Sequence, residues 1–146
     1  MIIEKVTTLT DSFKTQLGIN NPKLAICALN PHAGENGMFG DEEITQIIPA
    51  IEELRKNGIN IDGPFPADAL FTNCAKKECD YDCYIAMYHD QGLIPIKLLE
   101  QQNSVNTTIG LNVIRTSPAH GTAFDIAGQN IANPNSMINA IELAIK

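Results

Sequence analysis

The sequence predicts a layered α/β fold, with helices packed on a sheet. Short apolar runs typical of buried strands alternate along the chain with longer stretches that repeat their apolar residues at helical spacing. Polar, glycine-rich loops follow several of the apolar runs. A chain of 146 residues is long enough to bury one substantial core.

Helical spacing marks three segments. Residues 3–17 repeat apolar side chains and end before Gly18, which can close a helix. A second helix is expected from an N-cap at Asp41 to Gly58, with a kink or break at Pro49. Residues 134–145 form an amphipathic helix at the end, and a shorter helix is expected to start near residues 66–69.

Strands are expected at residues 23–29, 59–65, 83–88, 105–109 and 113–116, whereas residues 93–99 fit either a helix or a strand. Polar loops follow Leu29, Tyr88 and Thr116. Because open α/β sheets bind ligands beyond the carboxyl ends of their strands, these loops are the expected place for a site.

Charge and hydropathy exclude some function classes. The net charge of −7 argues against a nucleic-acid partner, since such binding depends on basic patches. No apolar run approaches the roughly 20 residues that cross a bilayer, and the N-terminus does not show the basic stretch followed by an apolar one that is typical of a signal peptide. A soluble cytoplasmic protein without a membrane partner is therefore expected. An anionic substrate would need a few well-placed cations.

The four cysteines include a C-x4-C-x3-C cluster at Cys74, Cys79 and Cys83. Structural zinc sites more often contain C-x2-C pairs, so reduced, unligated thiols are expected. Cys27 lies in an apolar run and is expected in the core.

All three histidines fall in the three polar loops: His32 in NPHAGE, His89 in YHDQG and His120 in SPAHGTAFDIAG. Imidazoles suit zinc, cobalt or iron, and a nearby carboxylate can orient the ring or join the ligands. Asp68 and Asp90 are the candidate catalytic carboxylates. The alternatives are solvated loop histidines and a helix N-cap at Asp68.

Lys97, Asn106 and Arg115 lie at or near the ends of apolar elements. A lysine and an arginine in such places can bind a phosphate, Arg as a planar fork and Lys as a point charge. The alternative is that both cations extend along the surface into solvent.

The stretch SPAHGTAFDIAGQNIANP resembles the cofactor loop of the isocitrate and isopropylmalate dehydrogenases, which bind NAD without a G-x-G-x-x-G motif. That resemblance implies cofactor-binding positions, with His120 and Asn133 near adenine, Asp125 near the ribose, and Gly121 and Thr122 shaping the loop. A strand-to-helix turn that needs glycine is the alternative.

Further motifs narrow the resemblance. NPHAGE, FGDEEI, IIPAIEELR, NIDGPFPAD, AMYHDQGLIPIK, VNTTIGL and IRTSPAHGTAFDIAG occur in an order that closely resembles the 4-hydroxythreonine-4-phosphate dehydrogenase family. The resemblance covers nearly everything after Lys23. It implies a divalent metal (Zn, Mg or Co) on His32 and His89, and a phosphorylated substrate on Lys97, Asn106 and Arg115. Family members are considerably longer, and the absent N-terminal portion would carry a third metal histidine.

The resemblance therefore implies the C-terminal portion, residues 1–146, of an oxidoreductase with the isocitrate/isopropylmalate dehydrogenase-like αβα fold. Its expected reaction is the NAD-dependent (or NADP-dependent) oxidation and decarboxylation of 4-phosphooxy-L-threonine to 3-amino-2-oxopropyl phosphate in pyridoxine and pyridoxal phosphate biosynthesis. A homodimer with sites between subunits is expected. Two alternatives are open: another four-carbon phosphorylated hydroxy acid as substrate, or a truncated domain without catalysis.

Overall fold

The computed structural model describes residues 1–76, 80–100 and 102–145, and the chain divides into two compact units at Leu93 and Ile94. Helix α4 (His89–Glu100) contains the point of division, and it resolves the segment 93–99 as helical. Within the described ranges, no helix has both the length and the apolar character needed to cross a membrane.

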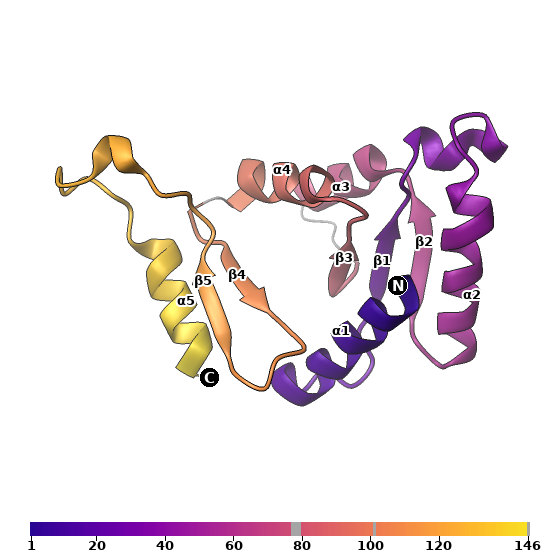
Figure 1. Cartoon of the computed structure of the whole chain (residues 1–146), viewed down its shortest axis with the longest axis horizontal. Helices are drawn as coiled ribbons and strands as arrows, with labels where there is room; N and C mark the ends of the chain where they lie inside the picture. Colours follow the sequence, from indigo (N-terminus) through magenta and orange to yellow (C-terminus); the bar gives the residue numbers. More distant parts are fainter. Residues whose placement is uncertain (77–79, 101, 146) are drawn as a thin grey trace. The chain divides into compact units, whose positions relative to one another are not determined.

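The first unit is built on a parallel three-stranded sheet of β1 (Leu24–Cys27), β2 (Ile61–Phe65) and β3 (Cys83–Ile85). Its strand order is β2-β1-β3, so β1 lies in the centre (Figure 1). Central strands of parallel sheets are buried on both faces, which explains why β1 is a continuous apolar run. The mixed α/β class with a parallel sheet is thereby confirmed.

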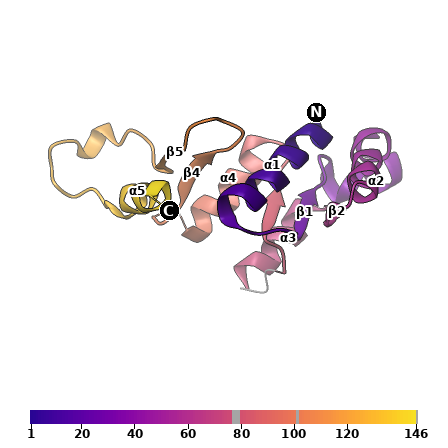
Figure 2. The same ribbon diagram turned by 90° about the horizontal axis from the view of Figure 1, so that it is seen from below.

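Helices cover both faces of this sheet. Leu24 and Ile26 pack in one cluster with side chains of α1 (Ile2–Leu17) and α2 (Ile48–Lys56). Ala25 and Cys27 face the other way and pack with α3 (Ala67–Ala75). Figure 2 shows α1 and α3 on opposite sides of the strands. The alternation of side chains along β1 thus builds one core on each face.

The ends of the helices follow local sequence signals in most cases. Helix α1 ends at Gly18, whose φ of 71° lets its N–H reach the Phe13 carbonyl. The second predicted helix is broken, as expected near Pro49, into a π-helical turn η2 (Glu43–Ile47) and α2. The helical segment begins at Glu42, directly after the predicted N-cap Asp41, whose carbonyl accepts the N–H of Thr45 at 2.8 Å.

The second unit pairs β4 (Val105–Thr108) with β5 (Arg115–Pro118) in an antiparallel hairpin, beside α5 (Asn135–Ile145) (Figure 1). The hydroxyl of Thr116 donates to the Ala140 carbonyl at 2.8 Å, which joins β5 to α5. The strand expected at residues 113–116 begins two residues later, since Val113 and Ile114 are exposed and unpaired with β4.

Cys27 is expected to resist alkylation in the native protein. Its side chain is fully buried, and burial, followed by the nearby Cys74, raises the pKa of the thiol to about 11. Since the thiolate is the reactive form, iodoacetamide should modify Cys27 only after unfolding. Peptide mass spectrometry with and without urea checks this, and equal labelling in both conditions would contradict it.

Candidate active site at the sheet edge and the C-terminal loop

The parallel sheet brings several predicted site residues to one edge. His32 follows β1, Asp68 follows β2, and His89 with Asp90 follows β3. Because the three strands run in the same direction, the segments after their carboxyl ends leave the sheet at the same edge. The polar segments predicted after Leu29 and Tyr88 thus follow β1 and β3 at this edge.

His32 lies in η1 (Pro31–Gly37), a left-handed turn rather than an irregular loop. Five successive residues have positive φ angles between 43° and 81°: His32, Ala33, Gly34, Glu35 and Asn36. The turn is closed by the Met38 N–H donating to the Glu35 carbonyl and the Phe39 N–H donating to the Gly34 carbonyl, each at 3.2 Å. The imidazole of His32 is exposed and lies 6.0 Å from the Phe39 ring, between centroids.

The buried carboxylate of Glu43 anchors the segment that leads into this turn. Its Oε1 accepts the N–H groups of Leu29 at 2.8 Å and Asn30 at 2.9 Å, and its Oε2 accepts Nδ2 of Asn30 at 2.9 Å. A Cβ at Gly34 would lie 2.7 Å from Oε2, so the turn passes close to the carboxylate. Burial raises the pKa of Glu43, but the hydrogen bonds from Asn30 and Leu29 outweigh it and lower the pKa overall.

His89 opens helix α4, which corrects the prediction of a loop there. The polar segment HDQG forms the first turn of α4, and the side chains of His89 and Asp90 in this turn are exposed to solvent. Nδ1 of His89 lies 2.8 Å from Oδ1 of Asp90, and both side chains are exposed. A carboxylate on one ring nitrogen orients the imidazole and leaves Nε2 as the nitrogen that can bind a metal.

Asp68 lies in the first turn of α3 and is exposed. The interpretation of Asp68 as a helix N-cap is wrong, since Pro66 holds that position and no side chain caps the helix. The Asp68 carboxylate therefore does not cap the helix.

The imidazole and carboxylate groups at this edge are of a kind that binds divalent metals, but too few of them lie together to complete a site. Imidazole and carboxylate groups bind zinc, cobalt and magnesium between them. Among residues 1–76, 80–100 and 102–145, no group of three His, Cys, Asp or Glu side chains could hold a metal ion. The two histidines thus fit part of a coordination shell. Cys79, part of the predicted thiol cluster, lies outside the described residues.

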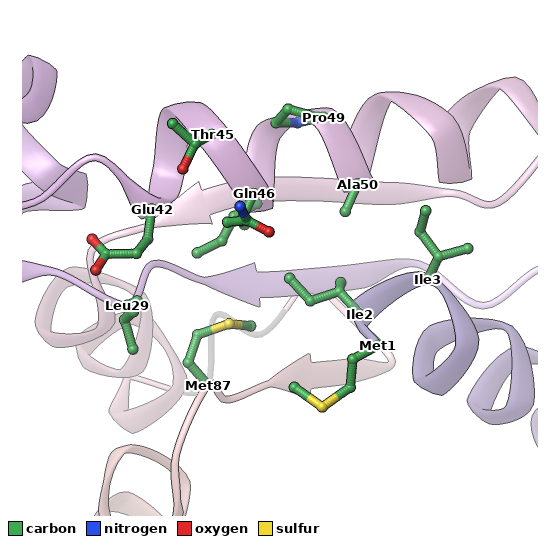
Figure 3. Close-up of a pocket in the computed structure, with 11 residues that line it drawn as sticks. Met1, Ile2, Ile3, Leu29, Glu42, Thr45, Gln46, Pro49, Ala50 and Met87 are labelled. Carbon is green, nitrogen blue, oxygen red and sulfur yellow. The ribbon is translucent and has the colours of Figure 1, made fainter.

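A cavity of about 620 Å³ lies next to this edge in the first unit. Figure 3 shows Leu29, Met87 and Glu42 among the side chains around it; Leu29 and Met87 follow β1 and β3. None of the site residues predicted from the sequence lines it, and its walls are mainly apolar.

The second unit contains the residues predicted to bind phosphate. Asn106 pairs with Ser117 and Thr108 pairs with Arg115 across the hairpin, so Asn106 and Arg115 share one face of it. The guanidinium of Arg115 donates to the Thr108 hydroxyl at 2.7 Å. Thr116, which bonds to α5, points to the other face. Lys97 is exposed on α4, and the described contacts do not bring it to this pair.

Two of the predicted cofactor residues line one cavity of about 260 Å³ in the second unit. His120 and Asn133 contribute to its wall together with Gln102, Ala123, Ile126, Ala132 and Ser136. Nδ2 of Asn133 donates to Gln102 at 3.0 Å, and Nδ1 of His120 lies 2.8 Å from the Gly121 carbonyl. Thr122 and Asp125 are exposed and outside this wall.

Sequence reasoning missed Ser136, which holds the backbone at Ala119, where the predicted cofactor loop begins. Its hydroxyl accepts the Ala119 N–H at 2.9 Å and donates to the Ser104 carbonyl at 2.6 Å, and the side chain is buried. Ser136 looks from the sequence like an ordinary residue of a helix's first turn; its partners are 17 and 32 residues away.

Ser136→Ala is expected to lower the free energy of unfolding by about 1–2 kcal/mol, because the Ala119 N–H and the Ser104 carbonyl each lose a part-buried hydrogen bond. Urea unfolding measures the loss, with Asn135→Ala at the start of the same helix as the matched control. Equal stability of Ser136→Ala and the wild type would contradict the anchoring role.

Comparison with known proteins identifies the family of the chain. Residues 1–144 match the family model described as pyridoxal phosphate biosynthetic protein PdxA. The chain is 54% identical over 144 residues to the 4-hydroxythreonine-4-phosphate dehydrogenase of Sulfurihydrogenibium sp. (strain YO3AOP1), covering 99% of this chain and 44% of the relative. A provisionally named D-threonate 4-phosphate dehydrogenase of Oceanobacillus iheyensis is 51% identical over 145 residues, covering 99% and 43%.

Solved structures are similar over the same range. The 4-hydroxythreonine-4-phosphate dehydrogenase of Klebsiella pneumoniae matches with a TM-score of 0.80 at 50% identity, covering 97% of this chain and 42% of that one. A terephthalate 1,2-cis-dihydrodiol dehydrogenase of Burkholderia xenovorans LB400 matches with a TM-score of 0.73 at 38% identity, covering 98% and 44%. The chain spans less than half the length of these relatives. It belongs to the PdxA family of pyridoxal phosphate biosynthetic proteins.

Proposed function

We propose that this chain is the C-terminal portion of a metal-dependent, NAD-linked dehydrogenase that acts on 4-phosphooxy-L-threonine. The main support for this proposal is the parallel pairing of β1 and β3, which directs the segments of His32 and His89 to one edge of the sheet. Relatives at about 50% identity are named 4-hydroxythreonine-4-phosphate dehydrogenases, which supports the same substrate. The two helix-covered faces of the sheet support an αβα fold of the isocitrate/isopropylmalate dehydrogenase-like type.

In the proposed reaction the substrate's secondary alcohol is oxidised to a ketone, and the resulting β-keto acid loses carbon dioxide. With the substrate's carboxylate ionised, the balance is 4-phosphooxy-L-threonine plus NAD⁺ giving 3-amino-2-oxopropyl phosphate, carbon dioxide and NADH, because the hydroxyl proton lost on oxidation is taken up by the carbon that loses carbon dioxide. His32 and His89 would contribute to holding a divalent cation, which would supply Lewis acidity to the alcohol, and the residues around His120 and Asn133 would hold NAD, which would supply the hydride acceptor.

The chain's own residues take separate roles in this proposal. Arg115 and Lys97 bind the phosphate, and Asn106 hydrogen-bonds the substrate from the same hairpin face as Arg115. Asp90 orients the His89 ring, and either Asp68 or Asp90 takes the proton of the alcohol. His120 and Asn133 line the cavity proposed for the cofactor's adenine, with Asp125 near the ribose and Gly121 and Thr122 shaping the loop.

We further propose a cytoplasmic homodimer in which subunits complete each other's sites. The limited number of metal donors among the described residues supports this need for further ligands. The same observation favours a second candidate, a domain that folds but does not turn over substrate alone. The Oceanobacillus iheyensis relative favours a different four-carbon phosphorylated hydroxy acid, D-threonate 4-phosphate.

NADH formation by the 146-residue chain, with and without added zinc, tests these candidates. Both 4-phosphooxy-L-threonine and D-threonate 4-phosphate are supplied, and the Klebsiella pneumoniae relative serves as the positive control. Zinc-dependent turnover of the first substrate supports the proposal. Turnover of D-threonate 4-phosphate alone would assign that compound as the substrate. No turnover of either compound would favour the non-catalytic domain.

A further inference from the structure

One side-chain amide in the wall of the second unit's cavity has a fixed orientation. Gln102 lines the cavity of about 260 Å³ together with His120 and Asn133. Its Oε1 accepts Nδ2 of Asn133 at 3.0 Å, and Oδ1 of Asn133 in turn accepts the Asn135 N–H at 2.9 Å. Because a backbone N–H can only donate, it determines which atom of each amide is the oxygen. Nε2 of Gln102 therefore keeps two hydrogens, and none of the residues that the structure describes accepts them.

The turn that carries Gln102 is tied to helix α5. The hydroxyl of Ser136 donates to the Ser104 carbonyl at 2.6 Å, and Nδ2 of Asn139 donates to the Asn103 carbonyl at 2.9 Å. These two carbonyls belong to the residues that directly follow Gln102, so the backbone beside the amide is held before any ligand binds. A side chain on a fixed backbone loses less conformational entropy when it contacts a ligand, which favours a specific contact over a loose one.

The rest of the cavity suits a flat ring of moderate size. Ala123, Ile126 and Ala132 supply apolar wall beside the polar side chains. The volume of about 260 Å³ lies slightly below the range of about 300–1,000 Å³ that is typical for drug-sized ligands. The cavity therefore has room for one ring system, such as a purine, rather than for a whole dinucleotide.

The available atoms of the Gln102 amide match one edge of adenine. The second lone pair of Oε1 can accept a hydrogen from the 6-amino group while Nε2 donates to N7, which is the bidentate pairing by which glutamine recognises adenine. Purines with an oxygen at position 6 present two acceptors on this edge, so Oε1 would face an oxygen and one hydrogen bond would be lost. The amide cannot exchange its two ends without breaking the bond from Asn133.

We propose that Gln102 determines the base specificity of the cofactor site by pairing with the 6-amino group and N7 of adenine. This inference rests on the cofactor cavity of the proposed function, and adds to it a residue and the base that this residue selects. Good bidentate pairs of this kind discriminate against the wrong base by roughly 5- to 150-fold. The chain should therefore bind adenine nucleotides more tightly than hypoxanthine nucleotides.

The test is a titration of the 146-residue chain with AMP and with IMP, followed by nitrogen–proton correlation NMR. The two nucleotides share the ribose and the phosphate and differ at position 6 of the purine. We expect AMP to bind about 5- to 150-fold more tightly than IMP and to shift the side-chain amide signal of Gln102. Gln102→Leu should bind both nucleotides equally, whereas Gln16→Leu, at an exposed glutamine of α1, should match the wild type. Because Gln102 is exposed, its variant should also keep the melting temperature of the wild type.

The outcomes separate the inference from the function on which it rests. AMP binding that shifts the signals of His120 and Asn133, but with the same preference over IMP in the wild type and in folded Gln102→Leu, overturns the role of Gln102 alone. Equal affinity of the wild type for AMP and IMP in that cavity also overturns it. A wild-type chain that shows no saturable AMP binding, or shifts only at residues outside the cavity, overturns the cofactor cavity and the role of Gln102 together.

Discussion

Replacing Glu43 by alanine is expected to lower the free energy of unfolding by about 4 kcal/mol. The substitution leaves the part-buried N–H groups of Leu29 and Asn30 without their acceptor and removes one partner of the Asn30 side chain. Hydrogen bonds to a charged acceptor are stronger than neutral ones, so the loss exceeds that of an ordinary buried bond. Urea unfolding followed by circular dichroism measures it.

Two further variants separate charge from volume at this position. Glu43→Gln keeps the size but loses the charge, and a loss of about 2 kcal/mol is expected. Glu52→Ala, an exposed glutamate of α2, is the control and should change stability by less than about 0.5 kcal/mol. A loss at Glu43 no greater than at Glu52 would refute the anchoring role.

The Glu43 contribution should also depend on pH in a defined direction. The pKa of Glu43 in the folded protein lies below the ordinary value of 4.5, so the carboxylate stabilises the fold above that pH. As the pH falls below 4.5 and through the folded-state pKa, the contribution is lost. The stability difference between the wild type and Glu43→Gln should therefore shrink on acidification over that range and stay constant near neutral pH.

His89→Ala is expected to weaken zinc binding by more than about 100-fold, beyond the loss from an outer partner. The proposed site has two imidazoles among the described residues, so removing one leaves a single strong donor. Titration calorimetry should then detect no binding. His120→Ala is the matched control, because this exposed histidine lines the cavity of the second unit. Equal affinity in His89→Ala and His120→Ala would eliminate His89 as a ligand.

Local patterns in the sequence predicted those elements that depend on neighbouring residues or on periodic apolar spacing. Apolar spacing located α1 with its end at Gly18, the apolar run located β1, and Pro49 located the break before α2. The same reasoning failed at His89, where a polar and glycine-containing segment suggested a loop. The helix forms there because Gln91 turns inward and bonds to backbone groups, one of them 63 residues away.

The candidate site likewise has features that local sequence patterns predicted and features that depend on contacts between distant residues. The sheet-edge rule pointed to the segments of His32 and His89, which leave the parallel sheet at one edge because strand direction is a property of the whole sheet. The third predicted segment, that of His120, follows β5 of the antiparallel hairpin instead. The roles of Gln91 and Glu43 were not predicted, since each depends on contacts between residues distant in sequence. Composition of residues 30–40 indicated an irregular loop but carried no signal for its handedness.

That handedness has a consequence for synthesis of the protein. An L residue with positive φ places its Cβ close to the following carbonyl oxygen, at a cost of roughly 1–2 kcal/mol per residue, and Ala33 has a φ of 55°. For a D residue the same backbone region is the favoured one, because the energy map is its mirror image. A chemically assembled chain with D-alanine at position 33 would therefore fold to the same turn with a gain in stability, whereas D-alanine within a right-handed helix destabilises it.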